Sequence, residues 1–416
     1  MGNPCLRFLA GAIPPLLLGS VLCVVAFGST AEAVPAWGGE SAGSMGWSSG
    51  LSAAHAAAIP AWARKYELEC IDCHTAWPKL NEYGREFKTN GYAIPGEKED
   101  LEAHNNVISE NLVLDKSFPV SARFIMRPFD KKKDKDVKIR SFHEIEVVIA
   151  GRVWKDVAAW VEIEAEDEDG FNVFVEQGVV TWNPMPQANI GMGWAPPFWA
   201  DPFDTLADGG RRMTRSHKGP LDLRFGARER LRSSSQWISF FGTAVDNRVF
   251  YLGGISAGGD DPEGGDAKDG FGRVMVKAIP GVYLGGFVLA GTNETQELPL
   301  GFSRSGFYFQ IEKGGFNAYG VVMQASDDLL DGSDDSWTVG YVEGFYVIPL
   351  QKIPMIVPLV RFDFLDDFTG TNDIAAILNF YLTQNIKAYF EWWQNLSAPD
   401  GREKNNRATI QVDLAF

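Results

Sequence analysis

The sequence predicts a mainly β protein: a transmembrane antiparallel β-barrel of about 16 strands, preceded by a small helical domain. From residue 118 to the end, runs of about ten residues alternate apolar and polar positions, and Gly, Asp, Asn and Pro separate them. The connections between the runs alternate between short and long, which is the asymmetry expected of membrane barrels. No run of about 20 apolar residues follows residue 33, so no membrane-spanning helix is expected there.

The run 157–166 illustrates the alternation. Its odd-numbered residues from Val161 on are apolar, and its even-numbered residues from Glu162 on are glutamates. In a soluble sandwich the polar face meets water, whereas in a membrane barrel the apolar face meets lipid and the polar face lines the lumen. The alternation of apolar and polar residues alone is consistent with both folds. Comparable runs occupy residues 145–149, 171–175, 374–381 and 386–393.

The chain end and the connections favour the membrane barrel. Residues 410–416 alternate up to the terminal Phe416, which resembles the C-terminal signal of bacterial outer-membrane barrels. An even strand number brings both ends of the barrel to one side. Residues 221–231 read as a strand or as loop, which changes the count by one hairpin. Short turns are expected at 155–156, 246–247, 280–281, 314–315 and 384–385, and long loops at 199–234, 258–269, 292–302, 327–334 and 397–403.

Residues 1–33 have the features of a cleaved export signal. Arg7 precedes an apolar run from Phe8 to Phe27, and Ala31-Glu32-Ala33 is a small-x-small cleavage site. The alternative is a membrane anchor, but two prolines and two glycines interrupt the segment. Residues 34–58 are rich in Gly, Ser and Ala and are predicted to form a flexible leader.

The clearest chemical motif lies just beyond this leader. Cys70 and Cys73 stand three positions apart and His74 follows directly, which is the attachment pattern of c-type haem. Each thiol adds across one vinyl group of the porphyrin, and the histidine becomes the proximal iron ligand. A zinc half-site and a redox dithiol are the alternatives for C-x-x-C. Because no second C-x-x-C and no downstream His pair completes a zinc set, we expect one haem c on these residues.

We expect residues 59–112 to form this monohaem cytochrome domain and residues 118–416 to form the barrel. Helices are predicted over 61–70 and 78–88, the second with proline at its first position. Leu80, Tyr83 and Phe87 then share one apolar stripe suited to packing on the macrocycle. A segment this short is too small to hold itself together without its cofactor.

The segment 60–92 resembles the haem segment of the fused monohaem cytochrome–porins of the outer membrane, best known from iron-oxidising bacteria. In that family C-x-x-C-H-T is followed by Pro-x-Leu-Asn, then Phe/Tyr-Gly-Arg, then Phe-Lys-x-x-Gly-Tyr. This chain has them in the same order, as Thr75 and residues 78–81, 83–85 and 87–92.

The resemblance implies a bacterial outer-membrane protein whose haem domain lies on the periplasmic side or within the barrel lumen, with outer-membrane lipid around the barrel. It implies electron transfer from an extracellular donor, typically ferrous iron, to a periplasmic carrier such as a cytochrome c, an activity of the iron:cytochrome c oxidoreductase type. Acidic outer loops are suited to gathering ferrous ions, although solubility and turn chemistry explain them equally. Their carboxylates are Asp260, Asp261, Glu263, Asp266, Asp269, Asp327, Asp328, Asp331, Asp334 and Asp335.

The distal haem ligand is the least determined part of the site. His104 is the first candidate, because it lies just before the barrel, although its polar neighbours also fit a linker residue. His143 reaches the haem if it points into the lumen. An open iron site instead fits ligand binding or peroxidase chemistry. The other candidates are His217, Met126, Met185, Met192 and Met213.

Composition narrows the function classes. The formal net charge of -16 argues against nucleic acid, whose binders need a basic face. Ser, His and Asp form no recognisable hydrolase motif. An electron-transfer cytochrome–porin is the first interpretation; the alternatives are a diffusion or anion porin with an accessory haem, a conduit with another donor or acceptor, and a sensory or enzymatic haem protein. Arginines clustered around the longest loop are consistent with the anion-porin alternative: Arg211, Arg212, Arg215, Arg224, Arg228, Arg230 and Arg232.

Overall fold

The computed structural model describes residues 61–94, 104–203, 205–206, 213, 231, 234–258, 263, 268–293, 300–329, 332–350, 355–366, 372–397 and 404–416. The predicted export signal (1–33) and leader (34–58) lie outside the described residues, as do residues 221–230, which were one reading of an extra strand.

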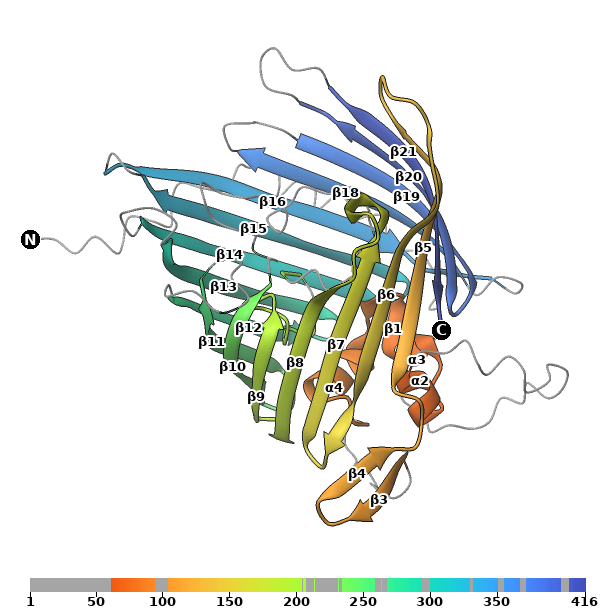
Figure 1. Ribbon diagram of the computed structural model, residues 1–416. Coiled ribbons are helices and arrows are strands. Elements are labelled where there is room, and N and C mark those ends of the chain that lie inside the picture. The colour runs from red at the N-terminus through yellow and green to blue at the C-terminus, as the bar shows by residue number, and fades with distance from the viewer. Residues whose placement is uncertain are drawn as a thin grey trace, which may run out of the picture. The chain divides into compact units, whose positions relative to one another are not determined.

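Sixteen long antiparallel strands close into a barrel (Figure 1). Each pairs with its neighbour in sequence, and β21 pairs with β5 to complete the ring. The predicted fold class is therefore confirmed. The strands are β5 (Val120–Lys132), β6 (Lys138–Trp154), β7 (Val157–Glu166), β8 (Phe174–Met185), β9 (Ala188–Ala195), β10 (Ser235–Ala244), β11 (Val249–Ala257), β12 (Lys268–Ile279), β13 (Val282–Asn293), β14 (Leu300–Lys313), β15 (Phe316–Asp328), β16 (Asp334–Tyr346), β18 (Met355–Asp366), β19 (Asn372–Thr383), β20 (Ile386–Asn395) and β21 (Asn406–Ala415), with the short β17 (Ile348–Pro349) beside β18.

The barrel has an apolar outside and a charged inside. Ile238, Val274 and Phe307 are among many large apolar side chains exposed on the outer surface. Charged side chains of the barrel strands, such as Arg361 and Asp413, are buried on the inward face. A soluble β-protein has the reverse polarity, so this distribution settles the ambiguity of the alternating pattern in favour of a barrel that suits lipid.

All five predicted short turns join consecutive strands at one end of the barrel, and the turn at 186–187 adds a sixth. The connection from β16 to β18 is longer, because β17 lies within it. Several predicted long loops fall partly outside the described residues. The C-terminal strand ends beside the start of β5, since the backbones of Ala122 and Phe416 hydrogen-bond to each other at the short-turn end.

The long connection after β9 differs from the prediction. It was expected to be an outer loop from residue 199 on, but Phe198, Trp199 and Leu206 are buried in the barrel's core cluster. Asp201 forms a buried ion pair with Arg273 of the wall, and the Tyr341 hydroxyl donates to the Thr205 carbonyl at 3.0 Å. Wall groups therefore fold the first part of this connection inward, a tertiary interaction that local composition does not reveal.

The N-terminal segment is short and mostly helical, as predicted, with different bounds. It contains α2 (Ala61–Tyr66), α3 (Cys70–Cys73) and α4 (Glu82–Thr89), together with the small strands β1 (His74–Ala76) and β2 (Lys79–Leu80). A helix from Pro78 was predicted, but α4 starts only after Asn81, whose side chain caps it by accepting from the Gly84 N–H at 2.9 Å.

A hairpin of β3 (Asn105–Ser109) and β4 (Leu112–Asp115) then leads to the barrel and crosses the expected domain boundary at residue 112. None of the helices in the described ranges is long and apolar enough to cross a membrane.

The N-terminal segment is held at the short-turn end of the barrel (Figure 1). The Ala61 N–H donates to the Ser121 hydroxyl at 2.6 Å, and the Cys70 N–H donates to the Gln384 side chain at 2.8 Å. The Tyr381 hydroxyl donates to the Trp77 carbonyl at 2.5 Å. The barrel residues in these contacts are far apart in sequence, so the docking surface for the segment forms only when the barrel closes.

Candidate functional site

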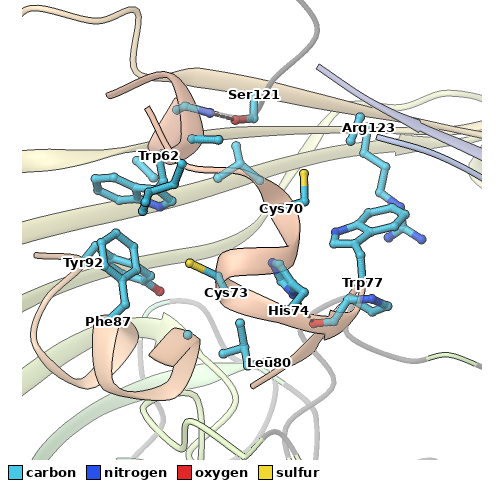
Figure 2. A pocket seen from close by; sticks show the side chains of 18 of the residues that line it. Trp62, Cys70, Cys73, His74, Trp77, Leu80, Phe87, Tyr92, Ser121 and Arg123 are labelled. Carbon is cyan, nitrogen blue, oxygen red and sulfur yellow. Dashed lines mark hydrogen bonds between the residues drawn. The ribbon is translucent and has the colours of Figure 1, made fainter. Parts of the chain in front are cut away.

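The two cysteines lie on one short helix. Residues three apart on a helix share a face, so α3 presents Cys70 and Cys73 on the same side. Asp72 helps to start the helix, because one of its carboxylate oxygens accepts from the Glu69 N–H at 2.8 Å. Figure 2 shows both sulfur atoms in a pocket together with the His74 ring.

His74 leaves the helix in an extended conformation, which directs its ring away from the helix axis. The Nδ1 atom lies 3.1 Å from the Pro78 carbonyl oxygen. A carbonyl can only accept, so we assign the proton to Nδ1, which leaves the ligand lone pair on Nε2. A metal-binding histidine ordinarily donates its other ring N–H in this way.

Asn81 and Gly84 lock the cysteine helix against α4. The Asn81 backbone donates to the Cys73 carbonyl at 3.0 Å, and its side chain donates to the Asp72 carbonyl at 2.9 Å. A Cβ atom on Gly84 would lie 2.1 Å from the Cys73 carbonyl oxygen, so only glycine allows this close approach. These contacts give a physical reason for an asparagine and a glycine at these places in the motif.

The pocket is a cavity of about 240 Å³ between the N-terminal segment and the barrel wall. Trp62 and Tyr92 stack with ring centroids 4.9 Å apart, and Phe87 packs edge-on against Trp62 at 5.9 Å. Leu80 and Phe87 line the cavity as predicted, whereas Tyr83 of the same predicted stripe does not. The barrel side contributes Arg123, Glu146, Val148, Ala150, Trp160 and Glu162.

The residues present fit a covalently attached haem. Two thiols on one helix face and an adjacent imidazole open onto a cavity with aromatic walls, which suits a flat apolar macrocycle. Burial raises the pKa of the Cys70 thiol to about 11 and the pKa of the Cys73 thiol to about 12. A redox dithiol needs the opposite shift, because its reactive form is the thiolate.

His104 does not line the cavity. Its Nδ1 lies 3.1 Å from the Lys65 carbonyl, and its ring packs edge-on against Tyr66 at 5.0 Å. These contacts with the end of α2, outside the cavity lining, do not support it as the distal ligand. His143, Met126, Met185, Met192 and Met213 do not line the cavity either, and His217 lies outside the described residues. Among the described residues, the cavity therefore offers no second histidine or methionine to the iron.

Two basic residues of the motif bind the barrel and the connection after β9, and one of them, Lys88, also lines the cavity. Arg85 makes a two-pronged ion pair with Glu312 at 2.6 and 2.8 Å and donates to the Tyr283 hydroxyl at 3.0 Å. Lys88 donates to the carbonyls of Trp199 and Asp201, at 2.7 and 2.9 Å. Arg85 and Lys88 thus dock the segment into this barrel, a role that the sequence did not reveal because their partners lie more than a hundred residues away.

The barrel wall carries a second cluster, which the sequence alone did not reveal. His143, Glu144 and Glu166 bring their ligand atoms within 4.8 Å of one another. The adjacent His and Glu on one strand were visible in the sequence, but the pairing that brings Glu166 opposite Glu144 was not. Of the predicted acidic loop residues, Asp260, Asp261, Asp266 and Asp331 lie outside the described residues, and Asp327 forms an ion pair with Arg304 at 2.7 Å.

Comparisons with known proteins agree on the fold. Salmonella typhi OmpF in complex with daunomycin is similar with a TM-score of 0.55 and 9% identity, over 74% of this chain and 98% of that one. An anion-selective porin from Comamonas acidovorans gives 0.51 and 10%, over 71% and 98%, and a loop L8 deletion mutant of OmpT from Vibrio cholerae gives 0.50 and 12%, also over 71% and 98%. The barrel has the porin fold. No family model and no curated protein matches the chain.

Proposed function

We propose that this protein is an outer-membrane cytochrome–porin that carries electrons across the outer membrane, taking them from extracellular ferrous iron and passing them to a periplasmic carrier. The observation that carries the proposal is the Cys70-Cys73-His74 pocket, with His74 Nδ1 bound to the Pro78 carbonyl and aromatic rings lining the cavity. The polarity and fold of the barrel support a location in the outer membrane. The sequence resemblance supports ferrous iron as the electron donor.

The chain's own residues would hold the haem as follows. Cys70 and Cys73 would form the thioethers, His74 Nε2 would bind the iron, and Trp62, Phe87 and Tyr92, which line the cavity, would supply its apolar wall. When bound, the haem supplies a one-electron redox centre. Since the hydrocarbon core of a bilayer is about 30 Å thick, a centre held inside a barrel shortens the path to a partner on each side.

Two elements that lie inside the barrel help to compare the electron conduit with the porin alternative. Aromatic side chains of the inward-folded connection, Phe198 and Phe203, pack against Phe271 and Tyr283 of the wall with centroids 5.6 and 5.2 Å apart. The N-terminal segment occupies the short-turn end. In the described part of the chain these two elements take up part of the lumen, which supports a conduit for electrons, while passive diffusion of solutes is the alternative that the porin fold supports.

The purified, oxidised protein mixed anaerobically with ferrous iron tests the donor. We expect the absorption bands of reduced haem to appear in stopped-flow spectra, because one electron moves from each ferrous ion to one ferric haem. Reduction by dithionite but not by ferrous iron would leave the haem intact and overturn iron as the donor.

A further inference from the structure

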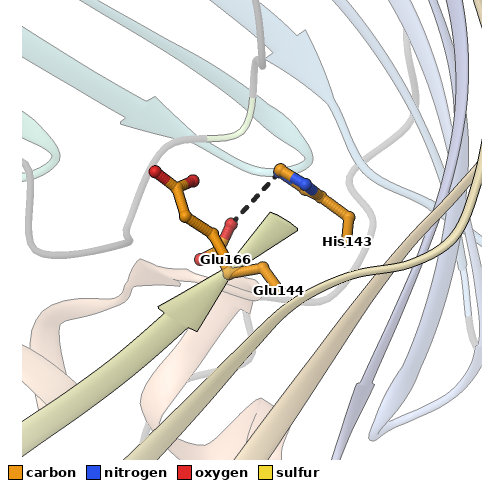
Figure 3. Close-up of side chains that lie close together, drawn as sticks. All are labelled: His143, Glu144 and Glu166. Carbon is orange, nitrogen blue, oxygen red and sulfur yellow. Dashed lines mark ion pairs between the residues drawn. The ribbon is translucent and has the colours of Figure 1, made fainter. Parts of the chain in front are cut away.

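The cluster on the barrel wall lies in the lumen of the barrel and has the composition of a cation site. His143 and Glu144 stand on β6 and Glu166 stands at the end of β7, where it pairs directly with Glu144 (Figure 3). His143 Nε2 lies 3.5 Å from a Glu144 oxygen, and His143 is 1% exposed. One imidazole and two carboxylates are ligands that suit divalent first-row metals.

The histidine is oriented as a metal ligand is. Its Nδ1 lies 2.8 Å from Asp167, directly after Glu166, so Nδ1–H donates to a carboxylate and the lone pair on Nε2 faces the two glutamates. Asp167 is itself fixed by Arg140, whose Nε donates to it at 2.7 Å. A carboxylate behind the ligand histidine is the usual outer partner at a metal site.

The carboxylates of the cluster have arginines nearby but no direct ion pair with them: Arg123 acts on Glu144 through space, and Arg127 and Arg140 act on Glu166. Like charges directly opposite each other in a sheet are destabilising, and β6 and β7 carry two such pairs in succession: Glu144 with Glu166, and Glu146 with Glu164. Arg123 neutralises Glu146 at 2.8 Å. In the described ranges no lysine or arginine forms an ion pair with Glu144, Glu164 or Glu166, so a bound cation would relieve the Glu144–Glu166 pair.

The cluster lies next to the haem pocket. Glu146 and Glu162 line that cavity. Glu144 lies two residues before Glu146 on the same lumen-facing row of β6, about 7 Å nearer to the long-loop end of the barrel. The row of glutamates on β6 and β7 therefore runs from the long-loop end of the barrel down to the cavity wall.

We propose that His143, Glu144 and Glu166 bind a divalent transition-metal ion in the barrel lumen, with Asp167 as the orienting partner of His143. The binding itself does not depend on the haem. Its role as the entry site for ferrous iron rests on the proposed function: a ferrous ion held there would donate one electron to a ferric haem held by Cys70, Cys73 and His74 and would leave as a ferric ion.

Manganese binding to the full-length, haem-loaded, oxidised protein tests the site. Free Mn²⁺ gives an electron paramagnetic resonance signal that decreases on binding, and Mn²⁺ does not reduce the haem. We expect saturable Mn²⁺ binding, weakened at least about tenfold in His143→Ala and in Glu166→Gln, because each removes a ligand. Glu164→Gln is the matched control: it removes the same charge one pair further along and should change the affinity by no more than about twofold.

Two results would overturn the site. Mn²⁺ could fail to bind the wild-type protein, or Glu164→Gln could weaken binding as much as Glu166→Gln, which would indicate a diffuse acidic surface. The role as entry site is tested separately: His143→Ala should slow haem reduction by dilute ferrous iron and leave reduction by dithionite unchanged. If Mn²⁺ binds through these residues but ferrous iron never reduces the wild-type haem, the cation site stands and the proposed function fails.

Discussion

Replacing both Cys70 and Cys73 with alanine is expected to remove all covalently bound haem from the full-length protein. Among the described residues no other thiol is available to form a thioether bond, and both cysteines line the same cavity. Haem-dependent staining after denaturing electrophoresis, together with the mass of the intact chain, measures the effect. Staining that survives denaturation in the double variant would contradict the attachment site.

His104→Ala is the matched control for this experiment. His104 packs against Tyr66 outside the cavity, so this variant should keep its covalent haem and the wild-type visible spectrum. A changed spectrum would restore His104 as the distal ligand and would mean that the segment rearranges when haem is attached.

Arg85→Leu is expected to loosen the N-terminal segment from the barrel. Arg85 is 4% exposed and holds Glu312 with two hydrogen bonds, and its guanidinium also lies over the rings of Phe203 and Tyr283. Removing one partner of a buried ion pair costs about 3–5 kcal/mol, since the other charge stays buried without compensation. That cost corresponds to at least about a hundredfold more of the undocked segment, measured as the rate of limited proteolysis within residues 61–94.

A surface ion pair at the same docking site provides the control. Lys277 pairs with Glu82 of α4, but the Glu82 side chain is 55% exposed, so Lys277→Ala should cost no more than about 1 kcal/mol and barely change proteolysis. The double variant Arg85→Leu with Glu312→Leu should recover part of the loss, because it leaves no buried charge. Equal proteolysis of wild-type and Arg85→Leu protein would contradict the docking role of Arg85.

The same variant separates the conduit from the porin alternative. If the segment closes the short-turn end, single-channel conductance in planar bilayers should be low for the wild-type protein and higher for Arg85→Leu. High conductance of the wild-type protein with unchanged haem would favour a diffusion porin.

Strand identity was predictable from sequence because the side-chain period of a strand repeats over many residues. The run 157–166 became β7 with the predicted bounds, and the predicted turn at 155–156 precedes it. What the alternation could not show was which face is inside, since burial depends on barrel closure. The inward fold after β9 was missed for the same reason: Arg273, the wall partner of Asp201, comes from another strand.

The candidate site was predictable where the chemistry is local. Cys70, Cys73 and His74 form one contiguous motif, and the structure brings all three to one cavity. The start of α4 was mispredicted because Asn81 competes with Pro78 as a helix start, and a capping side chain prevailed. His104 is close in sequence but packs against Tyr66 and does not line the cavity. The wall cluster required the register of β6 on β7, which no single-sequence pattern specifies.

The central claim is that this chain moves electrons across a membrane through its haem. The most direct test places the full-length protein in liposomes that enclose oxidised cytochrome c, and adds ferrous iron outside under anaerobic conditions. We expect the enclosed cytochrome c to become reduced with the wild-type protein and to stay oxidised with the Cys70→Ala, Cys73→Ala double variant. Equal reduction with both proteins, or none with a wild-type protein that carries its haem, would contradict the central claim.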